Sequence, residues 1–158
     1  MFDNIVRLKK IEQLKYNPDN ENPRDVIYNA LSDSLKSFGP LFGSRVMVAT
    51  APTPVRKSSL LLDSDYAQKQ INEGRWLGKC GLILKVGPTA FTRDPRFPEL
   101  PWDENIHGEK PQIGEWIYYK TSSTWEAGIA TDEKNGVPVR YVYDTDVVGI
   151  IYDIEKIY

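Results

Sequence analysis

The chain has 158 residues, 41% of them apolar, and a net charge of −2 from 20 basic and 22 acidic side chains. This length suits one domain, or one domain with an appendage, and the apolar content is too high for a disordered chain. Because charges of both signs are interspersed and no apolar run approaches roughly 20 residues, we expect neither a nucleic-acid partner nor a membrane segment.

The first forty residues carry a helical pattern. Apolar residues recur every third position over 5–14, which predicts one helix, and lysines interrupt this run so that it lacks the apolar core of a signal peptide. Asn22 can cap a second helix that has Pro23 at its first position, and Gly39 ends it. The sequence therefore predicts a helical N-terminal extension over 1–41, which either packs on the following domain or reaches a neighbouring molecule.

From residue 42 onward the pattern is that of strands. Asn135-Gly136 is a strong hairpin-turn signal, and several prolines make 91–111 an irregular insertion. Short strands without long helices between them predict a mostly β domain over 42–158, a small barrel or a sandwich. Alternating or continuous apolar residues place the strands at 45–49, 81–87, 113–119, 125–130, 137–143 and 147–152.

Four sequence blocks, taken in order, resemble the GroES (co-chaperonin) family. Residues 44–48, 81–88, 113–119 and 141–151 are similar to its D-R-V-x-V strand, its G-x-V-x-x-V-G strand, its V-G-D-x-V-x-F strand and its closing strand pair. The run from Val86 to Trp102 further resembles GroES-like proteins carried by tailed phages. The resemblance implies a GroES-like small β-barrel that assembles as a homo-oligomer, whereas the helical extension and the proline-rich insertion depart from the family pattern.

The resemblance makes one apolar loop the candidate partner-binding site. In the family, a loop after the first strand carries an apolar triplet that docks in a groove on the chaperonin ring. Ser59, Leu60, Leu61 and Leu62 occupy that place here. Burying two of these leucines on a partner would contribute roughly 3–5 kcal/mol per loop before ordering costs. The alternative is a short strand that packs on its own domain or on a neighbouring subunit.

The proline-rich insertion contains three aromatic residues that could form a second contact. Phe91, Phe97 and Trp102 suit a protein interface, because aromatic side chains are enriched there. The alternative is that the insertion is a packed surface loop.

The sequence predicts no catalytic or metal site. His107 is the only histidine and is expected to be a solvent-exposed loop residue, while Cys80, the only cysteine, is expected to be a small buried residue. With one cysteine the chain has no internal disulfide and fits a reducing compartment. Carboxylates are scattered, and no phosphate loop, nucleophile elbow or zinc motif is present. We therefore expect no enzyme activity, no cofactor and no metal.

Two functions remain open from the sequence. One is a co-chaperonin in the cytoplasm of a bacterial host, whose partner is a chaperonin ring. The other is a structural protein of the phage virion, a capsid decoration or cement protein that reuses the same domain and anchors on capsid protein through residues 1–41. In both cases the partner is a protein and the chain is a homo-oligomer.

Overall fold

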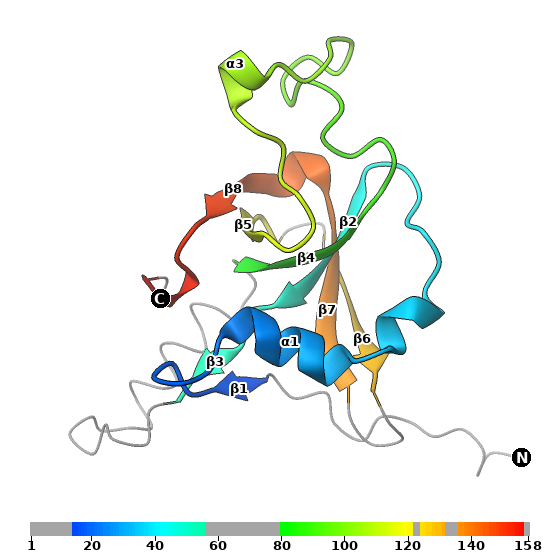
Figure 1. Cartoon of the computed structure of the whole chain (residues 1–158). Helices are drawn as coiled ribbons and strands as arrows, with labels where there is room; N and C mark the ends of the chain where they lie inside the picture. The colour runs from blue at the N-terminus through cyan, green and yellow to red at the C-terminus, as the bar shows by residue number, and fades with distance from the viewer. Residues whose placement is uncertain (1–13, 56–79, 122–123, 132–135, 157–158) are drawn as a thin grey trace, which may run out of the picture.

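The structure is a computed structural model, and it describes residues 14–55, 80–121, 124–131 and 136–156. The described chain is mostly β, with a six-stranded antiparallel sheet in the order β6-β7-β2-β4-β5-β8 and a two-stranded parallel sheet (Figure 1). The strands are β1 (Lys15–Tyr16), β2 (Arg45–Thr50), β3 (Thr53–Pro54), β4 (Cys80–Val86), β5 (Trp116–Tyr119), β6 (Trp125–Ala130), β7 (Gly136–Tyr143) and β8 (Val147–Ile151).

The large sheet is open, which corrects the closed barrel expected from the sequence. Among the described residues, β6 pairs with β7 alone and β8 pairs with β5 alone, so no ladder joins the two end strands. A barrel needs that last ladder, with a matching strand tilt and stagger. The sheet is instead strongly curved, and β8 runs across the direction of β7 (Figure 1).

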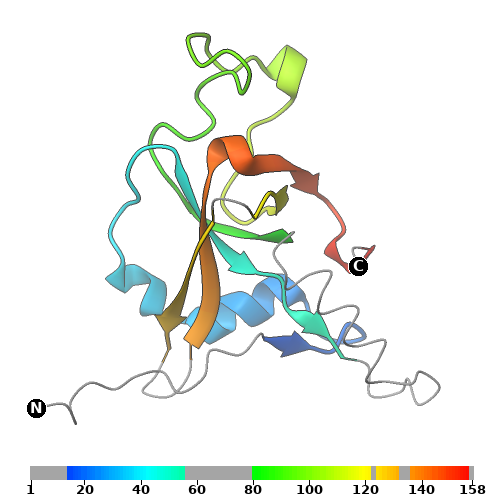
Figure 2. The ribbon, with the colours of Figure 1, turned by 180° about the vertical axis from the view of Figure 1, so that it is seen from behind.

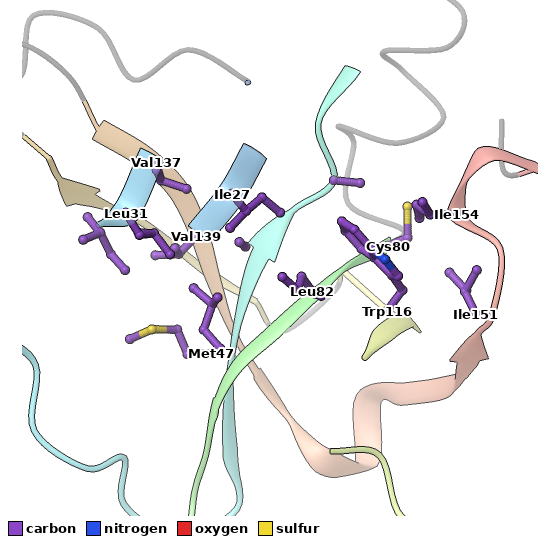
Figure 3. Close-up of a cluster of buried hydrophobic side chains, with 14 residues drawn as sticks. Ile27, Leu31, Met47, Cys80, Leu82, Trp116, Val137, Val139, Ile151 and Ile154 are labelled. Atoms are coloured by element: carbon purple, nitrogen blue, oxygen red, sulfur yellow. The ribbon is translucent and has the colours of Figure 1, made fainter. Parts of the chain in front are cut away.

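Both faces of the sheet are covered by an apolar cluster. Neighbouring residues of one strand point to opposite faces and so enter different clusters. On one face Met47 packs with Ile27 and Leu31 of the helix α1 (Pro23–Leu31) (Figure 3). On the other face Val48 packs in a second cluster that includes Phe91 from the β4–β5 connection. Burial on both sides explains why β2 and β4 have nearly continuous apolar sequences.

Helix α1 begins as predicted and belongs to the core. The Asn22 side chain accepts the Arg24 N–H at 2.9 Å, and Pro23 lies in the first turn. Ile27 and Leu31 are fully buried under the sheet. The helix ends eight residues before Gly39, because Ser32 takes a positive φ of 48° and the 3₁₀ turn η2 (Ser34–Ser37) follows. This part of the N-terminal extension therefore packs on its own sheet.

The described chain begins with a strand. Residues 1–13 lie outside the described residues, and so does most of the helix predicted over 5–14. The carbonyl of Leu14 accepts the Thr53 N–H at 2.7 Å, and β1 continues this parallel pairing with β3. Leu14 is thus held by strand pairing and not in a helix. None of the described helices is long and apolar enough to cross a membrane.

Two glycines allow the centre of the sheet to pack closely. A Cβ at Gly81 would lie 2.6 Å from the carbonyl oxygen of Ala49 on β2, and one at Gly87 would meet the carbonyl oxygen of Gly43. Side chains larger than hydrogen would therefore push β4 away from β2. A register shift between Met47 and Val48 also marks a bulge in this ladder, which increases the local bend of the sheet.

Candidate functional site

The predicted partner-binding residues Ser59, Leu60, Leu61 and Leu62 lie between β3 and β4 in the chain, outside the described residues. The described candidate site is therefore the connection between β4 and β5. Residues 91–108 of this connection extend beyond the sheet, and both views show them at the top of the molecule (Figures 1 and 2). We refer to them as the projecting loop. It is irregular, as predicted, apart from the one-turn helix α3 (Glu104–His107).

Asp94 organises the inside of the projecting loop. Its Oδ1 accepts the backbone N–H groups of Arg96 at 2.7 Å and Phe97 at 3.0 Å, and its Oδ2 lies 2.8 Å from Nε2 of His107. These hydrogen bonds favour the ionised carboxylate, so His107 first, and the Arg96 N–H second, hold the pKa of Asp94 below its usual value. Sequence reasoning missed this residue.

His107 is held in place, which corrects the expectation of a solvent-exposed histidine. Its side chain is 17% exposed, that of Asp94 is 9% exposed, and the two form an ion pair when the imidazole is protonated. The imidazole also lies 5.2 Å from the Trp102 ring, measured between ring centroids.

An aromatic contact joins the projecting loop to the sheet. The rings of Trp102 and Phe91 meet edge to face at 6.1 Å, and the Trp102 indole N–H donates to the carbonyl of Gly108 at 3.0 Å. The Phe91 N–H donates to Asp144, in the 3₁₀ turn η3 (Asp144–Asp146) between β7 and β8, at 3.0 Å. Phe91 is buried within the second core cluster. The base of the loop is therefore fixed to the sheet.

The three aromatic residues predicted as a possible interface have different surroundings. Phe91 is buried and presents no surface to a partner, Trp102 is half-buried, and Phe97 is 53% exposed. Two apolar residues that sequence reasoning missed are exposed on the same loop, Leu100 at 49% and Ile106 at 71%. Isolated apolar residues in an irregular segment show no periodicity, so their exposure had no signal in the sequence.

A second exposed surface lies on the sheet itself. Strand register places Trp125 opposite Tyr141, and Tyr143 opposite Arg45, all on one face. The rings of Trp125 and Tyr141 are 5.3 Å apart, and the Arg45 guanidinium lies 4.0 Å from the Tyr143 ring centroid. We refer to these four residues as the aromatic ladder. Trp125 and Tyr143 are exposed, whereas Arg45 and Tyr141 are half-buried. Aromatic and arginine side chains are enriched at surfaces that contact proteins.

The face of the sheet that carries the second core cluster also contains a buried cation. Arg140 on β7 is buried and pairs with Glu126 on β6 at 3.0 Å. Burial raises the pKa of Tyr119 on β5 to about 12, and the nearby Arg140 opposes this shift. Two strands, β2 and β4, separate β5 from β7 in the sheet. Arg140 affects the pKa of Tyr119 across these two strands because the curvature of the sheet brings β5 and β7 toward each other.

These surfaces suit contacts with other proteins. No group of three or more potential ligands that could hold a metal ion occurs in the described parts of the chain. Cys80 is buried. The candidate site thus consists of exposed apolar and aromatic side chains on a supported backbone, an arrangement that binds by burying area.

The sequence matches no model of a known protein family and no curated protein.

Proposed function

We propose that the chain is a GroES-like co-chaperonin, a protein without enzymatic activity that docks on a chaperonin ring and assists protein folding. The observation that carries the proposal is the position of the strands. The four blocks that resemble the family fall on β2, β4, β5 and the β7–β8 pair, in that order along the chain. The acidic turn of the closing block is the 3₁₀ turn η3, directly between β7 and β8.

The docking residues in this proposal are Leu60, Leu61 and Leu62, flanked by Ser59. Each copy would contribute one apolar loop, and a homo-oligomer would present several loops to several equivalent grooves. Weak individual contacts then add up through multivalent binding. Any nucleotide would belong to the chaperonin, which fits a chain that has no phosphate-binding loop.

The test is capping of a purified bacterial chaperonin by the full-length protein, imaged by electron microscopy with ADP or ATP. We expect nucleotide-dependent caps with the wild type and none with Leu61→Asp. Leu100→Asp is the matched control, because it places the same charge on an exposed leucine of the projecting loop. Absence of caps with the wild type, or equal loss in both variants, contradicts docking through residues 60–62.

We propose a structural protein of the phage virion as the second candidate, because one feature favours it. The projecting loop is supported from inside by Asp94 and presents Phe97, Leu100 and Ile106 to solvent. A firmly held apolar projection suits a permanent contact with capsid protein. In this case the chain would be present in purified phage particles at a fixed ratio to the capsid protein, and it would not cap a chaperonin.

A further inference from the structure

We propose that Asp94 and His107 form a clasp that locks the projecting loop into one conformation. The clasp joins two positions that are thirteen residues apart in the chain. When it is closed, Phe97, Leu100 and Ile106 are held at fixed positions on the outside of the loop.

Asp94, one partner of the clasp, takes part in several of the hydrogen bonds that hold the loop. The Asp94 side chain binds the imidazole with one oxygen and two successive backbone N–H groups with the other. The Asp94 N–H donates to the carbonyl of Leu100 at 2.9 Å, and the Trp102 N–H donates to the carbonyl of Thr92 at 3.0 Å. Asp94 therefore connects both arms of the loop and α3 through one residue.

Apolar packing contributes little to the shape of the same loop. Across residues 92–110 Asp94 is the one buried residue, and Trp102 and His107 are among the few that are half-buried. Local stability follows the amount of buried apolar surface, so a segment with so little of it opens easily unless polar contacts hold it. The Asp94–His107 contact is the buried polar contact available here, and its loss should free the loop from Arg93 to Gly108.

The chemistry of the pair makes the clasp sensitive to protons. The contact is a charge-assisted hydrogen bond when Asp94 is ionised and His107 is protonated, and such bonds are about twice as strong as neutral ones. Protonation of Asp94 in acid removes the charge that His107 and the two N–H groups recognise. The clasp is therefore weakened when Asp94 becomes protonated.

Other charged groups lie in the loop and next to it, and they make different contacts. They are Arg93, Arg96, Glu99, Asp103 and Glu104 in the loop, and Asp144 in the β7–β8 turn. The Asp103 carboxylate caps α3 by accepting the Asn105 N–H, and Asp144 accepts the Phe91 N–H. Within the described residues, none of these groups forms an ion pair with Asp94 or His107.

A locked loop has a consequence for binding that rests on the proposed contact of this loop with capsid protein. An apolar projection that is already ordered does not pay the ordering cost when it meets a partner. Opening the clasp would leave Phe97, Leu100 and Ile106 exposed but would no longer hold them at fixed positions.

The experiment is amide hydrogen exchange by NMR on the full chain in the absence of any partner. The readouts are the N–H groups of Arg96 and Phe97, which bind Asp94, and the internal reference is the Ile83 N–H, which binds the Glu115 carbonyl. The variants are His107→Phe, which keeps a ring against Trp102, and Asp94→Asn, which keeps an acceptor. Glu99→Gln is the control, because it removes an exposed carboxylate of the same loop.

We expect His107→Phe and Asp94→Asn to speed exchange at Arg96 and Phe97 by at least about tenfold, as the loss of a hydrogen bond between charged groups implies. Ile83 should not change, and Glu99→Gln should leave all three amides as they are. Exchange that changes less than about twofold in both clasp variants, while Ile83 stays protected, overturns the proposal whether or not the protein caps a chaperonin.

Discussion

The sheet and the projecting loop are stabilised in different ways. The sheet has an apolar cluster on each face, with α1 covering one of them. Beyond the buried Phe91 at its base, the projecting loop has one buried side chain, and that side chain is the carboxylate of Asp94. In the sheet, stability is distributed over many interchangeable apolar contacts. In the loop, it depends on a few directional contacts around Asp94, and a single substitution can release it.

The largest effect is expected from a cavity in the sheet. Leu82→Ala removes a fully buried side chain from the cluster under α1 (Figure 3), and we expect a loss of about 2–5 kcal/mol in the free energy of unfolding. Leu100→Ala makes the same change on the projecting loop, where the side chain is half in solvent, and should cost less than about 0.5 kcal/mol. Urea unfolding measures both. Equal losses would mean that the two regions do not differ as described.

The next effect tests the close approach of β2 and β4. Gly81→Ala places a Cβ against the Ala49 carbonyl oxygen, which is backbone and cannot move aside, so we expect a loss of about 1–3 kcal/mol. Gly149→Ala on β8 meets no atom within 4 Å and is the matched control. It should leave the free energy of unfolding unchanged to within about 0.5 kcal/mol. If Gly81→Ala is as well tolerated as Gly149→Ala, the packing between β2 and β4 is looser than this geometry requires.

A smaller effect tests the N-terminal cap of α1. Asn22→Ala removes the acceptor for the Arg24 N–H and should cost about 1 kcal/mol of the free energy of unfolding. Asn22→Asp keeps the acceptor and should be close to the wild type in thermal unfolding. A loss of equal size in both variants would indicate that Asn22 acts through something other than capping.

Sequence reasoning succeeded where the structure depends on local pattern. Alternating and continuous apolar residues predicted β2, β4, β7 and β8 to within about a residue at each end, and the pair Asn22-Pro23 predicted the start of α1. The strand predicted from residue 113 begins three residues later. The reason is local too, since Gly114 takes a φ of 91° and Glu115 closes a turn on Gln112.

The features that sequence reasoning missed arise between residues that lie far apart in the sequence. Whether the end strands β6 and β8 meet is decided by the total curvature of six strands, which no single period encodes. The contact between Asp94 and His107 joins two isolated residues without any repeating spacing. The predicted helix over 5–14 and the role of Leu60, Leu61 and Leu62 stay predictions, because these residues fall outside the described chain apart from Leu14.

The smallest effect on global stability is expected at Asp94, and it depends on pH. Because the pKa of Asp94 is lowered in the folded protein, its ionised form stabilises the fold above the ordinary carboxyl pKa of about 4. That contribution is lost as the pH falls through the lower folded value. The difference in the free energy of unfolding between the wild type and Asp94→Asn should therefore be present at pH 7 and shrink toward zero in strong acid. Glu99→Gln, at an exposed carboxyl of the same loop, should show no such dependence. A difference that persists unchanged in acid would mean that Asp94 supports the loop through its shape and not through its charge.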